Sequence, residues 1–132
     1  MAPGSPFLRA RWAAGLIAVA VAISGAALLQ PARAGSATLI MVEERGCIYC
    51  LRWDKDVGRG YARTAEGRAA PLRRVRRDAG VLRALAPVVY TPTFILVRDG
   101  REVGRITGYP GQLYFWDELS DMMAKAGIEA RS

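Results

Sequence analysis

The feature that most constrains this chain is a pair of cysteines, Cys47 and Cys50, the only two among its 132 residues. An apolar run, residues 36–44, precedes the pair without an internal glycine or proline, as expected of a buried strand. Beyond Cys47, apolar residues at spacings of three and four predict an amphipathic helix that ends near Gly58 and Gly60. The apolar positions of this pattern are Cys50, Leu51, Trp53 and Val57. The cysteines are therefore expected where a strand leads into a helix.

Three less regular segments follow. Residues 58–71 hold several glycines and charges and are interpreted as a loop or a broken extension of the helix. Residues 71–78 alternate arginines with apolar side chains, which predicts a strand with one solvated face. Residues 80–90 predict a short helix, and Pro87 must end it because proline lacks the N–H that would continue the hydrogen bonding.

The C-terminal part carries clearer signals. Residues 91–109 contain an apolar strand, an Asp99-Gly100 turn and a second strand, which together predict a β-hairpin. Residues 111–127 predict a helix with Gly127 as its C-terminal cap. The expected apolar face of this helix comprises Leu113, Trp116, Leu119, Met122 and Met123. The order of elements predicts an α/β fold in which helices flank a mixed sheet.

The first 34 residues are expected to be a signal peptide or an N-terminal membrane anchor. Two arginines precede an apolar run, residues 12–29, and residues 31–34 end in the small-x-small pattern that signal peptidase accepts. Because Arg9 and Arg11 hold the N-terminal side of the run in the cytoplasm, residues 35–132 are expected outside the cytoplasm, in an oxidising compartment. A CxxC pair normally rests there as a disulfide.

Charge does not indicate a nucleic-acid partner. The chain has 19 lysines and arginines against 12 acids, and three of the arginines lie in the expected leader. The arginine cluster at residues 73–77 fits the solvated face of a strand, and no nucleic acid is expected outside the cytoplasm.

The order of motifs resembles the thioredoxin superfamily, in which a CxxC opens a helix after a core strand and a Thr-Pro pair precedes a hairpin and a closing helix. A narrower resemblance is to the small exported thioredoxins of bacterial sulfur oxidation, the SoxS-like subfamily. It is carried by the stretches CIYCLRW and TPTFILVRDGREVGRITGYPG. The resemblance implies a thioredoxin-like fold over residues 35–132, with about four strands. It also implies a cis Thr91–Pro92 bond beside the dithiol, with Thr91, Pro92 and Tyr49 contacting the substrate.

The function that the resemblance implies is that of a periplasmic thiol-disulfide oxidoreductase with Cys47 and Cys50 as its catalytic residues. It implies a dithiol reductase that keeps cysteines of sulfur-oxidation proteins reduced. The expected reductant is a membrane thiol-electron transporter. No cofactor is expected, and the protein is expected to be a monomer. Two alternatives stay open, a disulfide isomerase and a Cu(I)-binding carrier.

The two thiols are expected to have different tasks. Cys47 lies at the helix N-terminus, where the helix dipole and free N–H groups stabilise a thiolate and lower the pKa of the thiol. It is the expected nucleophile, and Cys50 is the expected resolving thiol that attacks the mixed disulfide. The chain has no histidine, which disfavours a strong oxidant, and Tyr49 resembles the residue found in glutaredoxins and isomerases. Reduction is therefore the expected direction.

Metal and purely structural roles are less compatible with the pair. A structural zinc site needs four cysteine or histidine ligands, which two cysteines without any histidine do not supply, so no metal ligands are predicted. Two thiolates can hold Cu(I), which is why a copper carrier stays open. As a staple, a disulfide between these positions closes only a short loop and removes little chain entropy.

One departure from ordinary thioredoxins concerns proton transfer. Met41 stands where those proteins carry a buried aspartate. Glu43 and Glu44 are the candidate replacements, although adjacent strand residues point to opposite faces of a sheet. A group of aromatic residues is expected to belong to the core rather than to a partner groove. The group consists of Trp53, Tyr61, Tyr114, Phe115 and Trp116.

Overall fold

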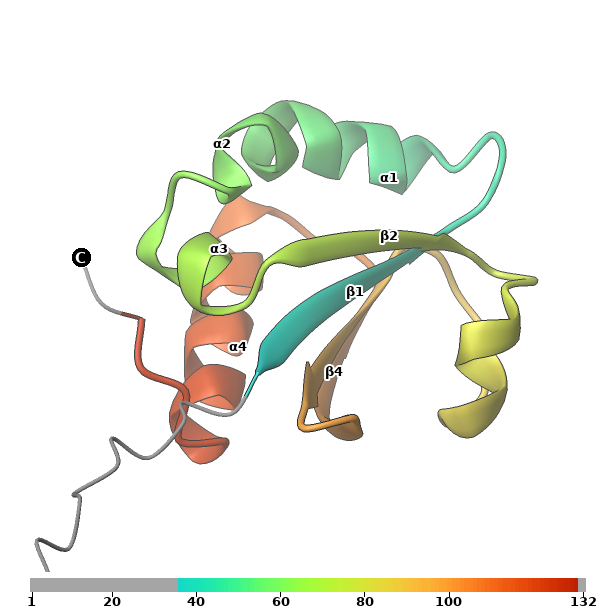
Figure 1. Cartoon of the computed structure of the whole chain (residues 1–132). Coiled ribbons are helices and arrows are strands. Elements are labelled where there is room, and N and C mark those ends of the chain that lie inside the picture. Colours follow the sequence, from blue (N-terminus) through green and yellow to red (C-terminus); the bar gives the residue numbers. More distant parts are fainter. Residues whose placement is uncertain (1–35, 131–132) are drawn as a thin grey trace, which may run out of the picture.

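The computed structural model describes residues 36–130, which form a four-stranded sheet in the order β2-β1-β3-β4 (Figure 1). β1 pairs with β2 in parallel, and the other two pairs are antiparallel, so the sheet is mixed as predicted. The expected leader, residues 1–34, lies outside the described residues. The strands are β1 Ala37–Glu43, β2 Leu72–Arg76, β3 Thr93–Arg98 and β4 Arg101–Thr107.

The first helical stretch ends at Tyr61, close to the predicted end near Gly58 and Gly60. It runs from α1 through the π-helical turn η1 into α2, so residues 58–71 are a broken extension of the helix rather than a loop. Gly58 lies in the wide turn, where an added Cβ would meet the Trp53 ring at 2.8 Å. The helical elements are α1 Ile48–Trp53, η1 Asp54–Gly58, α2 Arg59–Tyr61, α3 Ala65–Ala69, η2 Gly80–Ala84 and α4 Gln112–Lys125. Within residues 36–130, none of the helices has the length and apolar character needed to cross a membrane.

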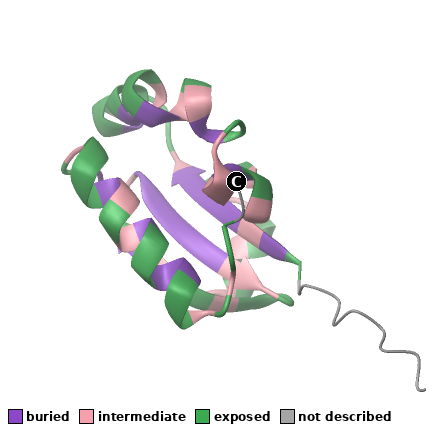
Figure 2. Ribbon diagram, turned by 90° about the vertical axis from the view of Figure 1, so that its left-hand side faces the viewer, coloured by how far each residue is buried: buried purple, intermediate pink, exposed green. Residues whose placement is uncertain are grey.

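The larger hydrophobic core lies between one face of the sheet and the helices α1 and α4. Alternate strand residues face opposite sides, so Leu39 and Met41 of β1 belong to this core. Trp53 lies within it, with its ring centroid 5.2 Å from that of Phe94 and 5.6 Å from that of Phe115. Figure 2 shows the strands largely buried and the helices buried mainly on the side that faces them. A single apolar layer thus holds both α1 and α4 against the sheet.

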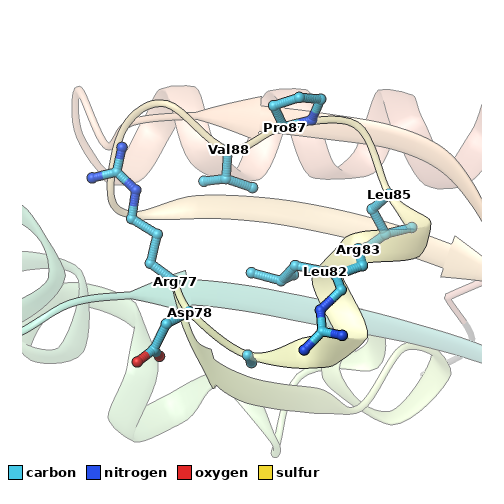
Figure 3. A pocket seen from close by; sticks show the side chains of 8 residues that line it. Arg77, Asp78, Leu82, Arg83, Leu85, Pro87 and Val88 are labelled. Carbon is cyan, nitrogen blue, oxygen red and sulfur yellow. The ribbon is translucent and has the colours of Figure 1, made fainter.

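The opposite face of the sheet has a much thinner cover. Its buried residues, among them Ile40 and Ile95, pack against the segment 79–88, which contains only the short 3₁₀-helix η2. In Figure 1 this helix, in yellow, lies on the side of the sheet away from α4. Beside it is a hollow of about 430 Å³ (Figure 3). The hollow is lined by Arg77, Asp78, Ala79, Leu82, Arg83, Leu85, Pro87 and Val88.

Two positions predicted on apolar helix faces are exposed instead. Leu51 is 68% exposed and Leu113 is 83% exposed. In α4 the buried position belongs to Phe115, which lies four residues before Leu119 on the same helix face. Of the aromatic group assigned to the core, Tyr114 is the exception, since 49% of it is exposed.

The turns after β3 and α4 follow the sequence prediction. Asp99 and Gly100 have φ angles of 51° and 77°, the left-handed pair that a tight two-residue hairpin turn requires. Gly127, with φ of 66°, follows α4, and the next N–H donates back to the carbonyl of Met123. The hairpin and the C-terminal cap are therefore confirmed.

Gly67 in α3 gives a test of the packing around α2. A Cβ at this position would lie 1.9 Å from the backbone oxygen of Tyr61, which a side-chain rotation cannot relieve. We expect Gly67→Ala to lower the free energy of unfolding by about 3 kcal/mol in urea denaturation. Gly60→Ala is the matched control, because a Cβ there has no atom within 4 Å and alanine favours the helix. Equal urea midpoints for the two variants would contradict this contact.

Candidate active site

The two cysteines form a disulfide at the N-terminus of α1. Their sulfurs are 2.03 Å apart and their Cα atoms are 5.2 Å apart. Cys47 is the N-cap residue, and its Sγ accepts a hydrogen bond from the backbone N–H of Cys50 at 3.2 Å. Cys50 is only 5% exposed, whereas Cys47 lies partly at the surface. This asymmetry favours Cys47 as the sulfur that an external partner meets.

The turn before Cys47 sets the direction in which the helix starts. Gly46 has φ of 74°, a left-handed conformation that side-chain-bearing residues rarely adopt. The N–H of Cys47 donates to the carbonyl of Glu44 across this turn at 3.4 Å. The chain thus reverses from the end of β1 into α1 within a few residues.

The Thr91–Pro92 segment enters the sheet beside this turn. The peptide bond between the two residues is cis, and Pro92 is buried. Its carbonyl accepts a hydrogen bond from the N–H of Gly108 at 2.8 Å, which fixes it to the end of β4. Because Thr93 is the register partner of Val42, the segment lies at the same end of the sheet as the disulfide.

Exposed apolar side chains occur on both segments that meet at this end of the sheet. From α1, Ile48 is 69% exposed and Tyr49 is 50% exposed; from the segment before Pro92, Val89 and Tyr90 are 60% and 65% exposed. The Tyr49 ring also lies 5.6 Å below the guanidinium of Arg52. Tyr49 is therefore accessible to a substrate, and its role in binding stays a prediction.

The two candidate carboxylates point to opposite sides of the sheet. Glu43 pairs with Arg74, with 2.8 Å between Oε2 and Nη2, and Arg74 also pairs with Asp54 at 2.7 Å. Glu44 instead accepts a hydrogen bond from Thr91 Oγ1 at 2.8 Å. The hydrogen bonds found in the described part of the chain join neither carboxylate to a cysteine.

Sequence reasoning missed the contacts that Glu44 makes with Thr91 and Arg77. Thr91 is 47 positions away from Glu44, and no local pattern links the two. The hydrogen bond from Thr91, followed by that from Arg77, lowers the pKa of the Glu44 carboxyl below its ordinary value. The sequence also gave no signal that Tyr109 would be buried, with its hydroxyl 3.1 Å from Asp56 Oδ2.

The arrangement suits thiol–disulfide exchange. The sulfur of Cys47 caps α1, and the buried sulfur of Cys50 lies one turn further along the helix. The neighbouring residues Val89 and Tyr90 expose apolar side chains. In residues 36–130 there is no group of three or more histidine, cysteine, aspartate or glutamate side chains placed to hold a metal ion.

Comparison with solved structures finds a relative of nearly the same length as the described fold. The periplasmic thioredoxin SoxS from Paracoccus pantotrophus, in its reduced form, is 40% identical with a TM-score of 0.65. The match covers 69% of this chain and 99% of that one. No protein-family model matches the chain, and no curated protein does.

The burial of the two sulfurs predicts selective alkylation. After reduction, brief treatment with iodoacetamide should modify Cys47 and leave Cys50 nearly unmodified, because Cys50 is only 5% exposed. Peptide mass spectrometry would give the ratio. Protein unfolded in urea is the control, since both thiols should then react. Equal labelling of the folded protein would contradict the assigned asymmetry.

Proposed function

The chain belongs to the thioredoxin superfamily as a SoxS-like thiol-disulfide oxidoreductase, and we propose that it is a periplasmic dithiol reductase that keeps cysteines of sulfur-oxidation proteins reduced. The observation that carries the proposal is the Cys47–Cys50 disulfide at the start of α1, at the same end of the sheet as Pro92. The solved relative is a periplasmic thioredoxin, which supports the compartment and the thiol-disulfide chemistry. The proposed substrate class is what the resemblance to the SoxS-like subfamily implies.

The proposed reaction is a two-step exchange that starts from the reduced dithiol. The Cys47 thiolate attacks one sulfur of a substrate disulfide, and the other substrate sulfur leaves as a thiolate that takes up a proton. The Cys50 thiol then loses its proton and attacks Cys47 Sγ, which releases the second substrate thiol. The substrate gains two electrons and two protons, and the protein ends with the disulfide seen in the structure.

The segment around Pro92 is the proposed platform for the substrate. An extended substrate strand pairs with the backbone of Thr91 and thereby brings its disulfide to Cys47. The exposed apolar side chains of α1 and of residues 89–90 support this role, because they would cover apolar residues that flank the substrate cysteine.

The proposed location requires an external source of electrons. The composition of residues 1–34 supports export as a signal peptide or membrane anchor, with residues 35–132 as the exported domain. In an oxidising compartment the protein's own disulfide must be reduced after each cycle. A membrane thiol-electron transporter is the proposed reductant, and the protein is proposed to act as a monomer.

Insulin reduction tests the catalytic roles of the cysteines. With dithiothreitol as the electron source, the wild-type protein should accelerate insulin precipitation, and Cys47→Ser should lower the rate to the uncatalysed level because the attacking sulfur is absent. Circular dichroism would show whether the variant is folded. A wild-type protein that is inert towards insulin but binds Cu(I) tightly would instead indicate a copper carrier. Reactivation of scrambled ribonuclease by a dimeric protein would indicate an isomerase.

Trapping tests the proposed substrates. Cys50→Ser should stall the reaction at the mixed disulfide, because the sulfur that resolves it is missing. Expressed in the periplasm of a sulfur-oxidising bacterium, the variant should yield adducts with sulfur-oxidation proteins, identified by mass spectrometry after non-reducing electrophoresis. The Cys47→Ser, Cys50→Ser double variant is the control and should yield no adduct. Adducts confined to a disulfide-forming oxidant would reverse the proposed direction of electron flow.

A further inference from the structure

We propose that Glu44 and Arg77 are positioning residues that hold residues 89–92 in the shape needed to bind an extended protein substrate. The inference rests on the proposed function in one respect, since it takes Thr91–Pro92 as the substrate platform. It assigns a task to two surface residues that do not take part in the chemistry of the cysteines.

The contacts form a continuous chain of three hydrogen bonds. Thr91 Oγ1 donates to Glu44 Oε1 at 2.8 Å, and Arg77 Nη1 donates to the other carboxylate oxygen, Oε2, at 3.2 Å. Arg77 Nη2 donates in turn to the carbonyl of Val89. Val89 and Thr91, the first and last of the three residues before Pro92, are therefore both bound to the pair formed by Glu44 and Arg77.

The pair is itself fixed to the sheet. The backbone N–H of Arg77 donates to the carbonyl of Glu43 at 3.0 Å, which continues the pairing of β2 with β1. Figure 3 shows the Arg77 side chain extending from the end of β2 towards the loop that carries Val88, while Asp78 points the other way. Glu44 lies three residues before Cys47, so the pair connects the approach to the disulfide with the proposed platform.

The platform needs such support because it has little regular structure of its own. Residues 85–92 lie between η2 and β3 and belong to neither a helix nor a strand. Arg105 holds the start of this segment through the carbonyls of Ala86 and Pro87, at 3.1 and 3.0 Å. The pair of Glu44 and Arg77 holds its end. A segment that is already ordered loses less conformational entropy when a substrate strand pairs with it, and therefore binds that strand more tightly.

The same contacts argue against Glu44 as the proton acceptor for Cys50. Each of its carboxylate oxygens already accepts a hydrogen bond, one from Thr91 and one from Arg77. These bonds lower the pKa of the carboxyl, so the group holds a proton less readily than an ordinary glutamate. Positioning fits this environment, whereas proton uptake does not.

The test compares a protein disulfide with a small one. Glu44→Ala removes the acceptor of the hydrogen bonds from both Thr91 and Arg77. We expect it to slow the oxidation of the reduced protein by insulin about fivefold or more, since losing a single hydrogen bond already corresponds to about fivefold. Oxidation by bis(2-hydroxyethyl) disulfide should stay within about twofold of the wild-type rate, because this molecule has no strand to pair with Thr91. The wild-type ratio of the two rate constants is the reference.

Three further variants and one control variant make the test specific. Glu44→Gln keeps an oxygen that can accept from Thr91 and should restore most of the insulin rate, whereas Thr91→Val removes the donor and should reproduce the defect. Arg77→Gln should also slow the insulin reaction selectively. Asp121→Asn breaks an exposed ion pair with Lys125 in the C-terminal half of α4 and serves as the matched charge control, with both rates unchanged.

The possible outcomes separate the two proposals. If Glu44→Ala leaves the insulin rate unchanged, or slows both disulfides equally, the positioning role is overturned. If Cys47→Ser reduces insulin at the wild-type rate in the same assay, the proposed function itself fails. A Cys47→Ser protein without activity, together with a Glu44→Ala protein of wild-type selectivity, would remove only the positioning role.

Discussion

The antiparallel pairing of β1 with β3 is the interaction on which the rest of this structure depends. Its register places Val42, near the end of β1, opposite Thr93, at the beginning of β3. The end of β1, which leads to the disulfide, and the beginning of β3, which follows Pro92, therefore lie at the same end of the sheet. In this way, two segments more than forty residues apart in the sequence lie together.

The two faces of the sheet support different parts of this site. The face under α1 and α4 carries the large aromatic core, in which Trp53 contacts Phe94 and Phe115, and this core anchors the helix that begins at the disulfide. The other face is covered only by residues 79–88, the segment that leads towards Pro92. The larger core thus lies under the cysteines, whereas the proposed substrate platform is held more by polar contacts at the surface.

Most of the fold was predictable because its signals are local. The apolar run before Cys47, the Asp99-Gly100 turn and the cap at Gly127 each specify their geometry within a few residues, and all three match the structure. Helix faces were less predictable: periodicity alone could not decide between Leu113 and Phe115, since that choice depends on the facing strand. The partners of Glu44 could not be predicted at all, because Thr91 and Arg77 reach it only through the tertiary fold.

The burial of Cys50 limits how many partners can react with the cysteine pair at one time. Cys47 is the sulfur that reaches the surface, so the oxidised client and the reducing donor of the proposed function must use the same sulfur and cannot do so together. The protein therefore behaves as a shuttle that alternates between two docking events rather than as a bridge that holds both partners at once. Every turnover includes two separate encounters and two separate releases, and the surface around Cys47 must bind each partner loosely enough to let it go.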